Sequence, residues 1–331
     1  MTSRPDPSSL PSPEEILLRS GTDIPSFLPP RPASLFAERA LRLRERSASH
    51  AMRDYLLLMA VVCEAQHARA QRLPAIALPN AAQVAAARAS GQPLLSAVDW
   101  PRDPLWRAEL HALLRQVLDK LPADSPARDG VQAVLDMPDT TLEHQAERLL
   151  AGITLGLDMA AAPLIAAGLQ LYWTQLVAAT ALGQPDAFDA SGERTHCPCC
   201  GSLPTASITR VGKGLHGQRY LHCALCNAEW RLKQVTCTHC LATEGIEYQA
   251  LQALAASAPA TERAAIEAET CSHCHHYLKI MHMEGDGHVE PVADDLASVT
   301  LDLLVSDAGY TRHGTNLMLL FGEGDASPEA G

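Results

Sequence analysis

Apolar residues recur with a helical period through the first half of the chain. Between Leu105 and Leu121 they return every three or four positions, so they fall on one stripe of a helix. Prolines and glycines separate this segment from similar ones. The similar stripes lie in residues 48–72, 139–156 and 158–182. The pattern predicts an all-α helical N-terminal domain, built as a bundle, over residues 34–190.

The residues before this domain are rich in proline and serine and include the pair Pro29-Pro30. This composition favours an extended or flexible chain, so we expect residues 1–33 to form a flexible leader. The N-terminus lacks the basic region and apolar run of an export signal. We therefore expect a cytoplasmic protein whose cysteines are reduced.

Beyond Gly183-Gln184-Pro185 the pattern changes to short alternating segments. Residues 206–211 and 219–221 flank a glycine-rich turn, as the strands of a hairpin do, and residues 229–233 alternate as a third strand. A second, imperfect copy of this order follows, with an alanine-rich insertion at 250–268. An acidic start and an apolar stripe then predict a closing C-terminal helix at 294–304.

These segments together predict an α+β fold. The helical domain is followed by two small ribbon-like modules, the first over residues 191–236 and the second, with the closing helix, over residues 237–316. We expect residues 317–331 to form a flexible tail.

Cysteine pairs of the form Cys-x-x-Cys are the most specific motif in the chain. Nine of the ten cysteines lie between Cys197 and Cys274, and eight of them form four such pairs. Both sulfurs of a pair can reach one ion from a tight turn, and two pairs complete a tetrahedral site. The eight candidate metal ligands are Cys197, Cys200, Cys223, Cys226, Cys237, Cys240, Cys271 and Cys274.

The order of the pairs favours one tetrathiolate site in each module. The first site would combine the first two pairs along the chain, and the second site would combine the last two. A cross-braced arrangement, first pair with third and second with fourth, is the alternative, because spacing alone does not exclude it. Four sulfurs suit zinc and also a single iron, so we expect two tetrathiolate-bound metal ions, iron or zinc.

Other polar residues near these motifs are interpreted as structural. Cys199 is expected on the exposed side of its turn, as a spectator. Nine of the fourteen histidines lie between residues 191 and 290, and we expect them around the sites or in solvent. Asp294, Asp295 and Asp302 are expected to cap the closing helix and to be solvated rather than to form a catalytic pair.

Charge, apolar runs and missing motifs exclude several function classes. The net charge is −12 and the sequence pI is about 5.6, so phosphate backbones would repel the chain and nucleic acid is a poor partner. The segment 159–182 could span a membrane by length, but its polar residues favour a buried core helix. No phosphate-binding loop, dinucleotide fingerprint or serine-hydrolase elbow is present. Closed four-sulfur sites leave no open position for a substrate, so we expect no enzyme activity.

The motifs and their order resemble the formate dehydrogenase accessory protein family, FdhE. The resemblance rests on six segments: CPCCG (197–201), RYLHCALCNAEWR (219–231), CTHC (237–240), ETCSHCHHYLKI (269–280), ADDLASVTLDLL (293–304) and GYTRHGTN (309–316).

This resemblance implies a cytoplasmic protein with a helical domain and two rubredoxin-like modules. It also implies a role in the production of active formate dehydrogenase, through binding of the molybdenum-containing catalytic subunit, and it associates iron with the eight paired cysteines. Two other hypotheses remain, a zinc-ribbon nucleic-acid-binding protein and a rubredoxin-type electron carrier. Residues 191–290 hold eight Lys and Arg against ten Asp and Glu, so no basic stripe supports the former.

Overall fold

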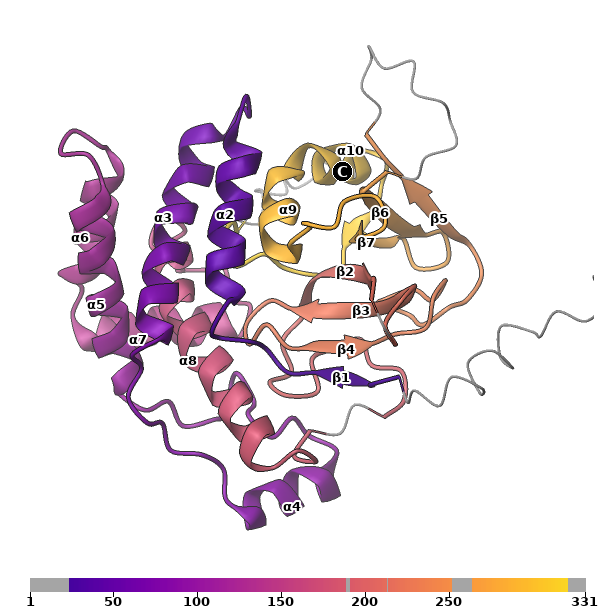
Figure 1. Ribbon diagram of the computed structural model, residues 1–331, viewed down its shortest axis with the longest axis horizontal. Helices are drawn as coiled ribbons and strands as arrows, with labels where there is room; N and C mark the ends of the chain where they lie inside the picture. Colours follow the sequence, from indigo (N-terminus) through magenta and orange to yellow (C-terminus); the bar gives the residue numbers. More distant parts are fainter. Residues whose placement is uncertain (1–23, 189–190, 213, 252–263, 321–331) are drawn as a thin grey trace, which may run out of the picture.

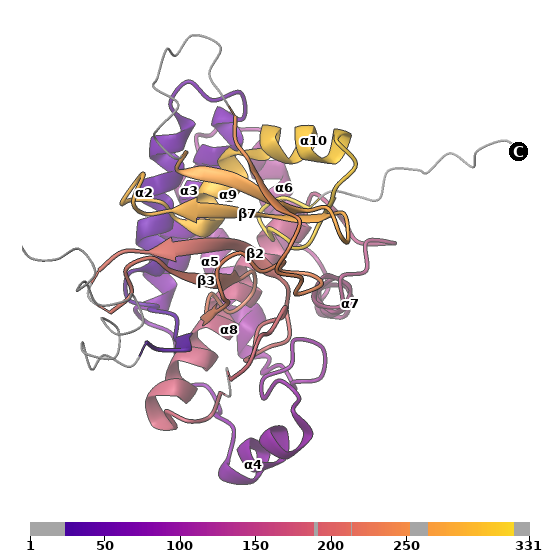
Figure 2. The same ribbon diagram turned by 90° about the vertical axis from the view of Figure 1, so that its right-hand side faces the viewer.

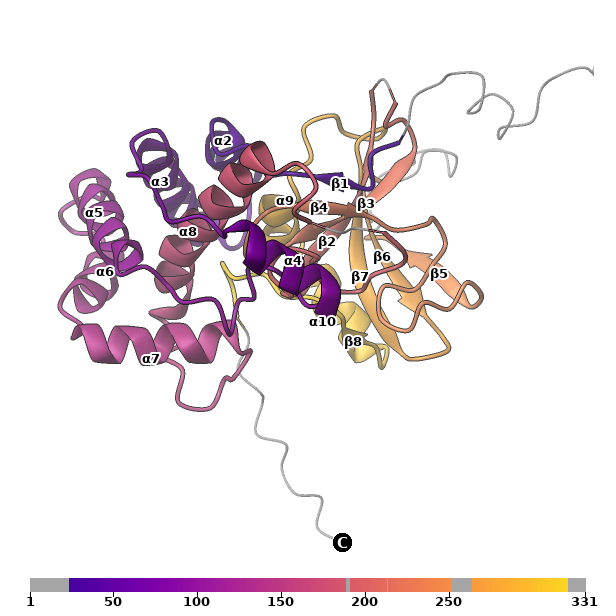
Figure 3. The ribbon, with the colours of Figure 1, turned by 90° about the horizontal axis from the view of Figure 1, so that it is seen from below.

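Helices occupy the N-terminal half of the chain, as the apolar period predicts. The computed structural model describes residues 24–188, 191–212, 214–251 and 264–320. Figure 1 shows most of the helices standing side by side next to the sheet, and Figure 3 shows the same two parts from below. The helices before the first cysteine pair are α2 (Leu35–Ser47), α3 (Arg53–Ala70), α4 (Ala81–Ser90), α5 (Leu105–Lys120), α6 (Ala127–Leu135), α7 (Asp139–Leu150) and α8 (Ala162–Gly183).

Helix α8 lies at the centre of this helical layer. It packs against α3, α5 and α7, and its Trp173 is fully buried. A Cβ atom on Gly168 would lie 2.8 Å from the Cβ of Leu110, so the glycine permits the close approach of α8 to α5. By length and composition α8 would also pass as a membrane span, but 78% of its most apolar window is buried. The structure therefore agrees with the predicted core helix.

Strands from both cysteine-containing segments form one mixed sheet, in the order β1-β4-β3-β2-β7-β6-β5, with β8 paired to β7. Its strands are β1 (Phe27–Leu28), β2 (Pro204–Arg210), β3 (Gln218–Cys223), β4 (Glu229–Arg231), β5 (Ile246–Gln249), β6 (Ile266–Cys271), β7 (His276–His282) and β8 (Thr311–Arg312). The α+β class and the two modules are confirmed. In addition, β2 and β7 pair in parallel, with Ser207 opposite Ile280, so the two modules share a sheet (Figure 2).

The predicted leader is partly wrong, because residues 24–33 belong to the fold. Phe27 of β1 pairs with Trp230 of β4, and the Tyr220 hydroxyl donates a hydrogen bond to the carbonyl of Pro25 at 2.7 Å. The Phe27 ring also lies 5.5 Å from that of Phe188. Strand β4 thus gains β1 as a backbone partner, although the proline-rich sequence around β1 did not indicate a strand. Residues 1–23 of the predicted leader lie outside the described residues.

The predicted closing helix consists of two helices, α9 (Pro291–Ala297) and α10 (Val299–Asp307). They meet at Ser298, whose hydroxyl donates to the carbonyl of Asp294 at 2.7 Å. The predicted tail is wrong for residues 317–320, because Met318 is buried and its carbonyl accepts a hydrogen bond from Tyr55 of α3. The rest of the tail, from residue 321, and residues 252–263 of the alanine-rich insertion lie outside the described residues.

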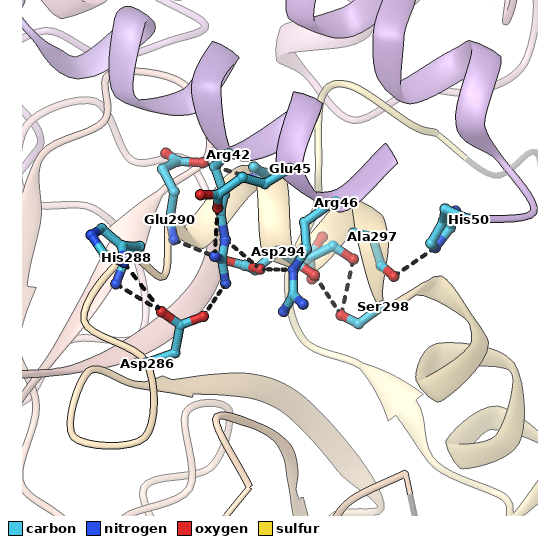
Figure 4. A network of polar contacts seen from close by, with 12 residues as sticks. Arg42, Glu45, Arg46, His50, Asp286, His288, Glu290, Asp294, Ala297 and Ser298 are labelled. Atoms are coloured by element: carbon cyan, nitrogen blue, oxygen red, sulfur yellow. Dashed lines mark hydrogen bonds and ion pairs between the residues drawn. The ribbon is translucent and has the colours of Figure 1, made fainter. Parts of the chain in front are cut away.

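A buried polar network joins the helical layer to the C-terminal helices. Figure 4 shows Arg42 and Arg46 of α2 directed at Asp294 of α9. The Nε atoms of these arginines lie 2.9 Å and 2.6 Å from the Asp294 carboxylate, which is fully buried. Arg42 also donates a hydrogen bond to Asp286. Burial opposes the charge of Arg42, but the hydrogen bonds that it donates to Asp294 and Asp286 raise its pKa. The network therefore holds α2 against α9, which lie side by side in Figure 1.

Candidate metal centres

The structure brings the eight paired cysteines together in two groups of four. Site 1 is formed by Cys197, Cys200, Cys223 and Cys226. Site 2 is formed by Cys237, Cys240, Cys271 and Cys274. In each site one pair lies in a turn between elements, and the other begins at the end of a strand, β3 or β6, and continues into the following turn. This grouping is the sequential one, and the cross-braced alternative is wrong.

The sulfur geometry of both sites fits a tetrahedral metal ion. In site 1 the Sγ atoms of Cys197 and Cys226 lie 3.5 Å apart. In site 2 those of Cys240 and Cys271 lie 3.8 Å apart. Four sulfurs at a bond length of about 2.3 Å around one ion would be separated by about 3.8 Å. The separations in both sites are close to this value, so each group can hold an ion with little movement.

Each pair is followed by a residue in the left-handed backbone region. The φ angle is 77° at Gly201, 58° at Asn227, 62° at Leu241 and 56° at His275. This conformation lets the N–H of His275 donate to the carbonyl of Cys271 at 2.9 Å, and those of Gly201 and Leu241 donate in the same way to Cys197 and Cys237. Glycine adopts it freely, whereas a side chain with a Cβ atom makes it unfavourable by roughly 1–2 kcal/mol. All four turns therefore share one geometry despite their different residues.

Backbone N–H groups point at the sulfurs from within these turns. The N–H groups of Leu225 and Cys226 donate to Cys223 Sγ, both at 3.4 Å. Those of His239 and Cys240 donate to Cys237 Sγ at 3.4 Å and 3.5 Å. Such donors stabilise negative charge on sulfur and orient it toward a cation.

Site 1 is buried against the helical layer. All four of its cysteines are at most 1% exposed. The N–H of Leu95, in the loop before α5, donates to the carbonyl of Cys199 at 2.9 Å. The Gln170 side chain of α8 donates to the carbonyl of Ala224 at 2.7 Å. Both turns of site 1 are thus hydrogen-bonded to the N-terminal domain.

Asn227 connects site 1 to two helices at once. Its amide oxygen accepts from Arg39 Nη2 of α2 at 2.8 Å and lies 3.2 Å from His222 Nε2. Its amide nitrogen donates to Thr174 Oγ1 of α8 at 2.8 Å. Arg39 is fully buried and its Nε also binds Glu290, which precedes α9. A single side chain next to Cys226 therefore links the first module, α2 and α8.

Site 2 is half-exposed and lies away from these contacts. Cys237 and Cys271 are buried, but Cys240 and Cys274 are only partly so. Burial opposes ionisation of Cys240, yet the N–H of Ala242 and the neighbouring thiols lower its pKa to about 6. The turn after Cys274 is held by the C-terminal segment, where the N–H of Thr311 donates to the carbonyl of His275 at 2.8 Å.

Several histidines gather around site 2. The rings of His239 and His276 are stacked, with centroids 3.7 Å apart and 2° between their planes. His273 Nδ1 lies 3.8 Å from Cys240 Sγ. His313 packs edge-on against His239, and burial lowers its pKa to about 4. This gathering agrees with the expectation that histidines surround the sites.

Two expectations about single residues are wrong. Cys199 is fully buried rather than exposed, because the loop before α5 covers its turn. Asp294, Asp295 and Asp302 are at most 6% exposed rather than solvated. They are paired with basic side chains, as in the contact between Asp295 Oδ1 and Lys279 Nζ at 3.0 Å.

The sequence analysis missed Arg39 as a part of site 1. Arg39 lies on the stripe that Phe36, Ala40 and Leu43 form along α2, and all four are buried. A basic residue on an apolar stripe is a signal of a buried partner, and it was available in the sequence.

Comparisons with known proteins match nearly the whole chain. Models of three consecutive FdhE domains match it, N-terminal over residues 24–185, central over 196–234 and C-terminal over 235–319. The protein named FdhE homolog from Klebsiella pneumoniae is 35% identical over 307 residues, which are 93% of this chain and 95% of that protein. Protein FdhE from Salmonella dublin is 34% identical with the same coverage.

A solved structure has the same fold. It is the crystal structure of the FdhE protein from Pseudomonas aeruginosa, which is 33% identical in sequence. The match covers 90% of this chain and 100% of the crystallised one, with a TM-score of 0.75.

Proposed function

The chain belongs to the FdhE family, and from this premise we propose that it is a non-catalytic accessory factor for formate dehydrogenase. In this role it binds the molybdenum-containing catalytic subunit in the cytoplasm and assists its maturation. The observation that supports this role is similarity over 93% of the chain to proteins named FdhE, together with three consecutive family domains.

The eight paired cysteines hold two metal ions in this proposal, either iron or zinc. Four sulfurs fill the coordination sphere of each ion, so no position remains for a substrate or an activated water. The ions would therefore fix the two modules in shape and, if they are iron, respond to redox state.

We further propose that an apolar groove contacts the catalytic subunit. The groove is a cavity of about 570 Å³ at the junction of the α7–α8 loop, site 1 and the C-terminal segment. Val98 and Ile153 on its rim are 62% and 47% exposed, and neighbouring Leu155 is 83% exposed. Grouped aliphatic side chains on a surface are typical of a protein-binding site. The occupant would be an apolar segment of the catalytic subunit.

The test is a pull-down of the catalytic subunit with a matched pair of variants. Leu155→Glu places a charge beside the groove, whereas Leu182→Glu places one at the end of α8, on a leucine that is 86% exposed. We expect the first variant to lose most of the captured subunit and the second to retain it. In a strain that lacks the gene for this protein, formate dehydrogenase activity should be restored by the Leu182→Glu variant and only weakly by the Leu155→Glu variant.

The outcomes separate the surface from the function. Normal formate dehydrogenase activity in the deletion strain, with no capture of the subunit by the unaltered protein, would contradict the accessory role. Equal capture of the subunit by both variants would be compatible with the accessory role but would show that the subunit contacts another surface. Elemental analysis and optical spectra of anaerobically purified protein would identify the metal, because iron bound to thiolates absorbs visible light and zinc does not.

A rubredoxin-type electron carrier is the second candidate, because Cys240 and Cys274 bring site 2 close to solvent. Iron at site 2 would then show a reversible one-electron potential. Absence of such a potential in iron-loaded protein would exclude this candidate.

A further inference from the structure

Four histidines form a row of rings from site 2 toward site 1, and neither tetrathiolate group uses them. His276 is the first residue of β7, and His239 lies between the two cysteines of a site 2 pair. The centroid of His239 lies 5.1 Å from that of His313, which lies 5.9 Å from that of His196, next to Cys197. The row therefore begins with a stacked pair at the half-exposed edge of site 2.

Three possible metal-binding atoms lie close together at that edge. One ring nitrogen from each of His239 and His276 and the sulfur of Cys274 lie within 4.8 Å of one another. Two nitrogens bound to one zinc at about 2.0 Å are separated by roughly 3.3 Å in a tetrahedral site. The two rings are parallel, and a ring nitrogen binds a metal in the plane of its ring, so His239, which is exposed, must turn out of the stack for both nitrogens to bind one ion.

The orientation of His276 suits a metal ligand. Its Nδ1 lies 2.8 Å from the carbonyl of Cys274, so this nitrogen carries the proton and donates it to the carbonyl. The other nitrogen, Nε2, then keeps its lone pair. A histidine that binds a metal usually donates its second ring N–H to a carbonyl or carboxylate in this way, because the bond fixes the tautomer and the ring.

We propose that His239 and His276, with the sulfur of Cys274 as a shared ligand, form a third metal site for a borderline divalent cation such as zinc, cobalt or nickel. Imidazole and thiolate are the donors that such cations prefer, and a thiolate sulfur has lone pairs for two ions. The site deepens the proposed metal function, because it depends on Cys274 as a ligand of site 2. It is independent of the enzyme that the protein assists.

The position of this site gives it a role in loading site 2. His239 is exposed, and His276 and Cys274 are half-buried, whereas Cys237 and Cys271 are buried. An ion bound by the histidines already contacts one thiolate of site 2. It can therefore pass to the remaining sulfurs by exchanging one ligand at a time. Site 1 has no comparable set of donors among the described residues.

The test counts zinc ions in the full-length protein after equilibrium dialysis against a buffer of fixed free zinc. We expect three ions per unaltered chain and two in a His239→Gln/His276→Gln double variant, with at least about tenfold weaker binding of the third ion. The matched control is His216→Gln/His288→Gln, which removes two histidines that are 72% and 86% exposed at their side chains. The control should retain three ions.

A second measurement separates the third site from the stability of site 2. Protein that keeps the ion of site 1 but has lost that of site 2 to a chelator is mixed with zinc, and a metal-sensitive dye follows the uptake. The rate of uptake at site 2 should fall in the double variant, while the thermal midpoint of the protein with both tetrathiolate sites filled stays unchanged. Two ions in the unaltered chain, or three in the double variant, would overturn the proposal. Loss of the site 2 ion along with the third would also overturn it, because the histidines would then support site 2 itself. Fewer than two ions in the unaltered chain would reject both the third site and the tetrathiolate centres, without affecting the pull-down result.

Discussion

Sites 1 and 2 have the same ligands and turns but opposite surroundings. The four sulfurs of site 1 are buried, and α2, α8 and the loop before α5 hydrogen-bond to its turns. Two cysteines of site 2 are partly exposed, and its neighbours are histidines and the short C-terminal segment. We therefore expect the surroundings, more than the ligand set, to determine what a bound ion would do. An ion in site 1 would hold the first module against the helical domain, and an ion in site 2 would exchange with solvent or respond to redox state.

The sharpest test of this contrast removes two cysteines from each site. We expect Cys223→Ser/Cys226→Ser to unfold much of the protein, because the turns of site 1 are hydrogen-bonded to the helical domain. Binding of structural zinc is worth about 10–16 kcal/mol in small zinc domains, against a total domain stability of about 5–15 kcal/mol. Cys240→Ser/Cys274→Ser should lose the ion of site 2, together with the proposed third ion that shares Cys274, and retain the helical domain. Circular dichroism melts and metal analysis measure both effects, and equal loss of helix in the two variants would break the comparison.

Asn227 tests the connection between site 1 and the helices. Asn227→Ala leaves buried Arg39 without one acceptor and Thr174 without a donor. Each unsatisfied buried group costs about 1–3 kcal/mol, so we expect a loss of roughly 3 kcal/mol in the free energy of unfolding. Leu241→Ala is the matched control, because Leu241 has the same place and backbone conformation in a turn of site 2. Urea unfolding should show a change of at most about 0.5 kcal/mol there. Similar losses in both variants would contradict the proposed difference in anchoring.

Metal removal tests the difference in access. A chelator must displace the protein sulfurs stepwise, and Cys240 and Cys274 are within reach of solvent whereas the sulfurs of site 1 are not. We expect two phases of metal release, with the ion of site 2 leaving at least about tenfold faster, which is about 1.4 kcal/mol in the barrier. The release is measured by the absorbance of a chelator that changes colour when it binds the metal. The Cys240→Ser/Cys274→Ser variant should lack the fast phase, and a single phase in the unaltered protein would contradict the assignment.

The local parts of both sites were predictable from the sequence. Spacing within each Cys-x-x-Cys pair fixes where two sulfurs lie, and the repeated order of pairs and strands predicts which pairs combine. The helices of the first half follow from their apolar period in the same way. These features depend on neighbours a few residues apart, which a single sequence displays directly.

The difference between the sites was not predictable, because it depends on contacts across the chain. Arg39 and Asn227 are separated by 188 positions, and Arg42 and Asp294 by 252. No local pattern shows that Asp294 is buried, since the arginines that neutralise it lie in another domain. The same holds for Cys199, which becomes buried only when the loop before α5 covers it.

The smallest expected effect concerns the turns that follow each pair. Leu241 has a φ of 62°, which is unfavourable for a residue with a Cβ atom. Leu241→Gly should therefore raise the free energy of unfolding of the second module, which contains site 2, by about 0.5–1 kcal/mol. Gly201→Ala is the reciprocal change at site 1, where φ is 77° and a Cβ atom would lie 3.1 Å from Cγ of Pro93. It should lower that free energy by about 1–2 kcal/mol, since it adds both backbone strain and a close contact with the helical domain. Urea unfolding at saturating metal measures the two changes. Their signs are opposite because the first substitution removes a Cβ atom at a positive φ and the second adds one, and the second effect is larger because the site 1 turn also lies against Pro93. If Gly201→Ala proved neutral, the helical domain would have to yield at Pro93, and the tight anchoring of site 1 would be contradicted.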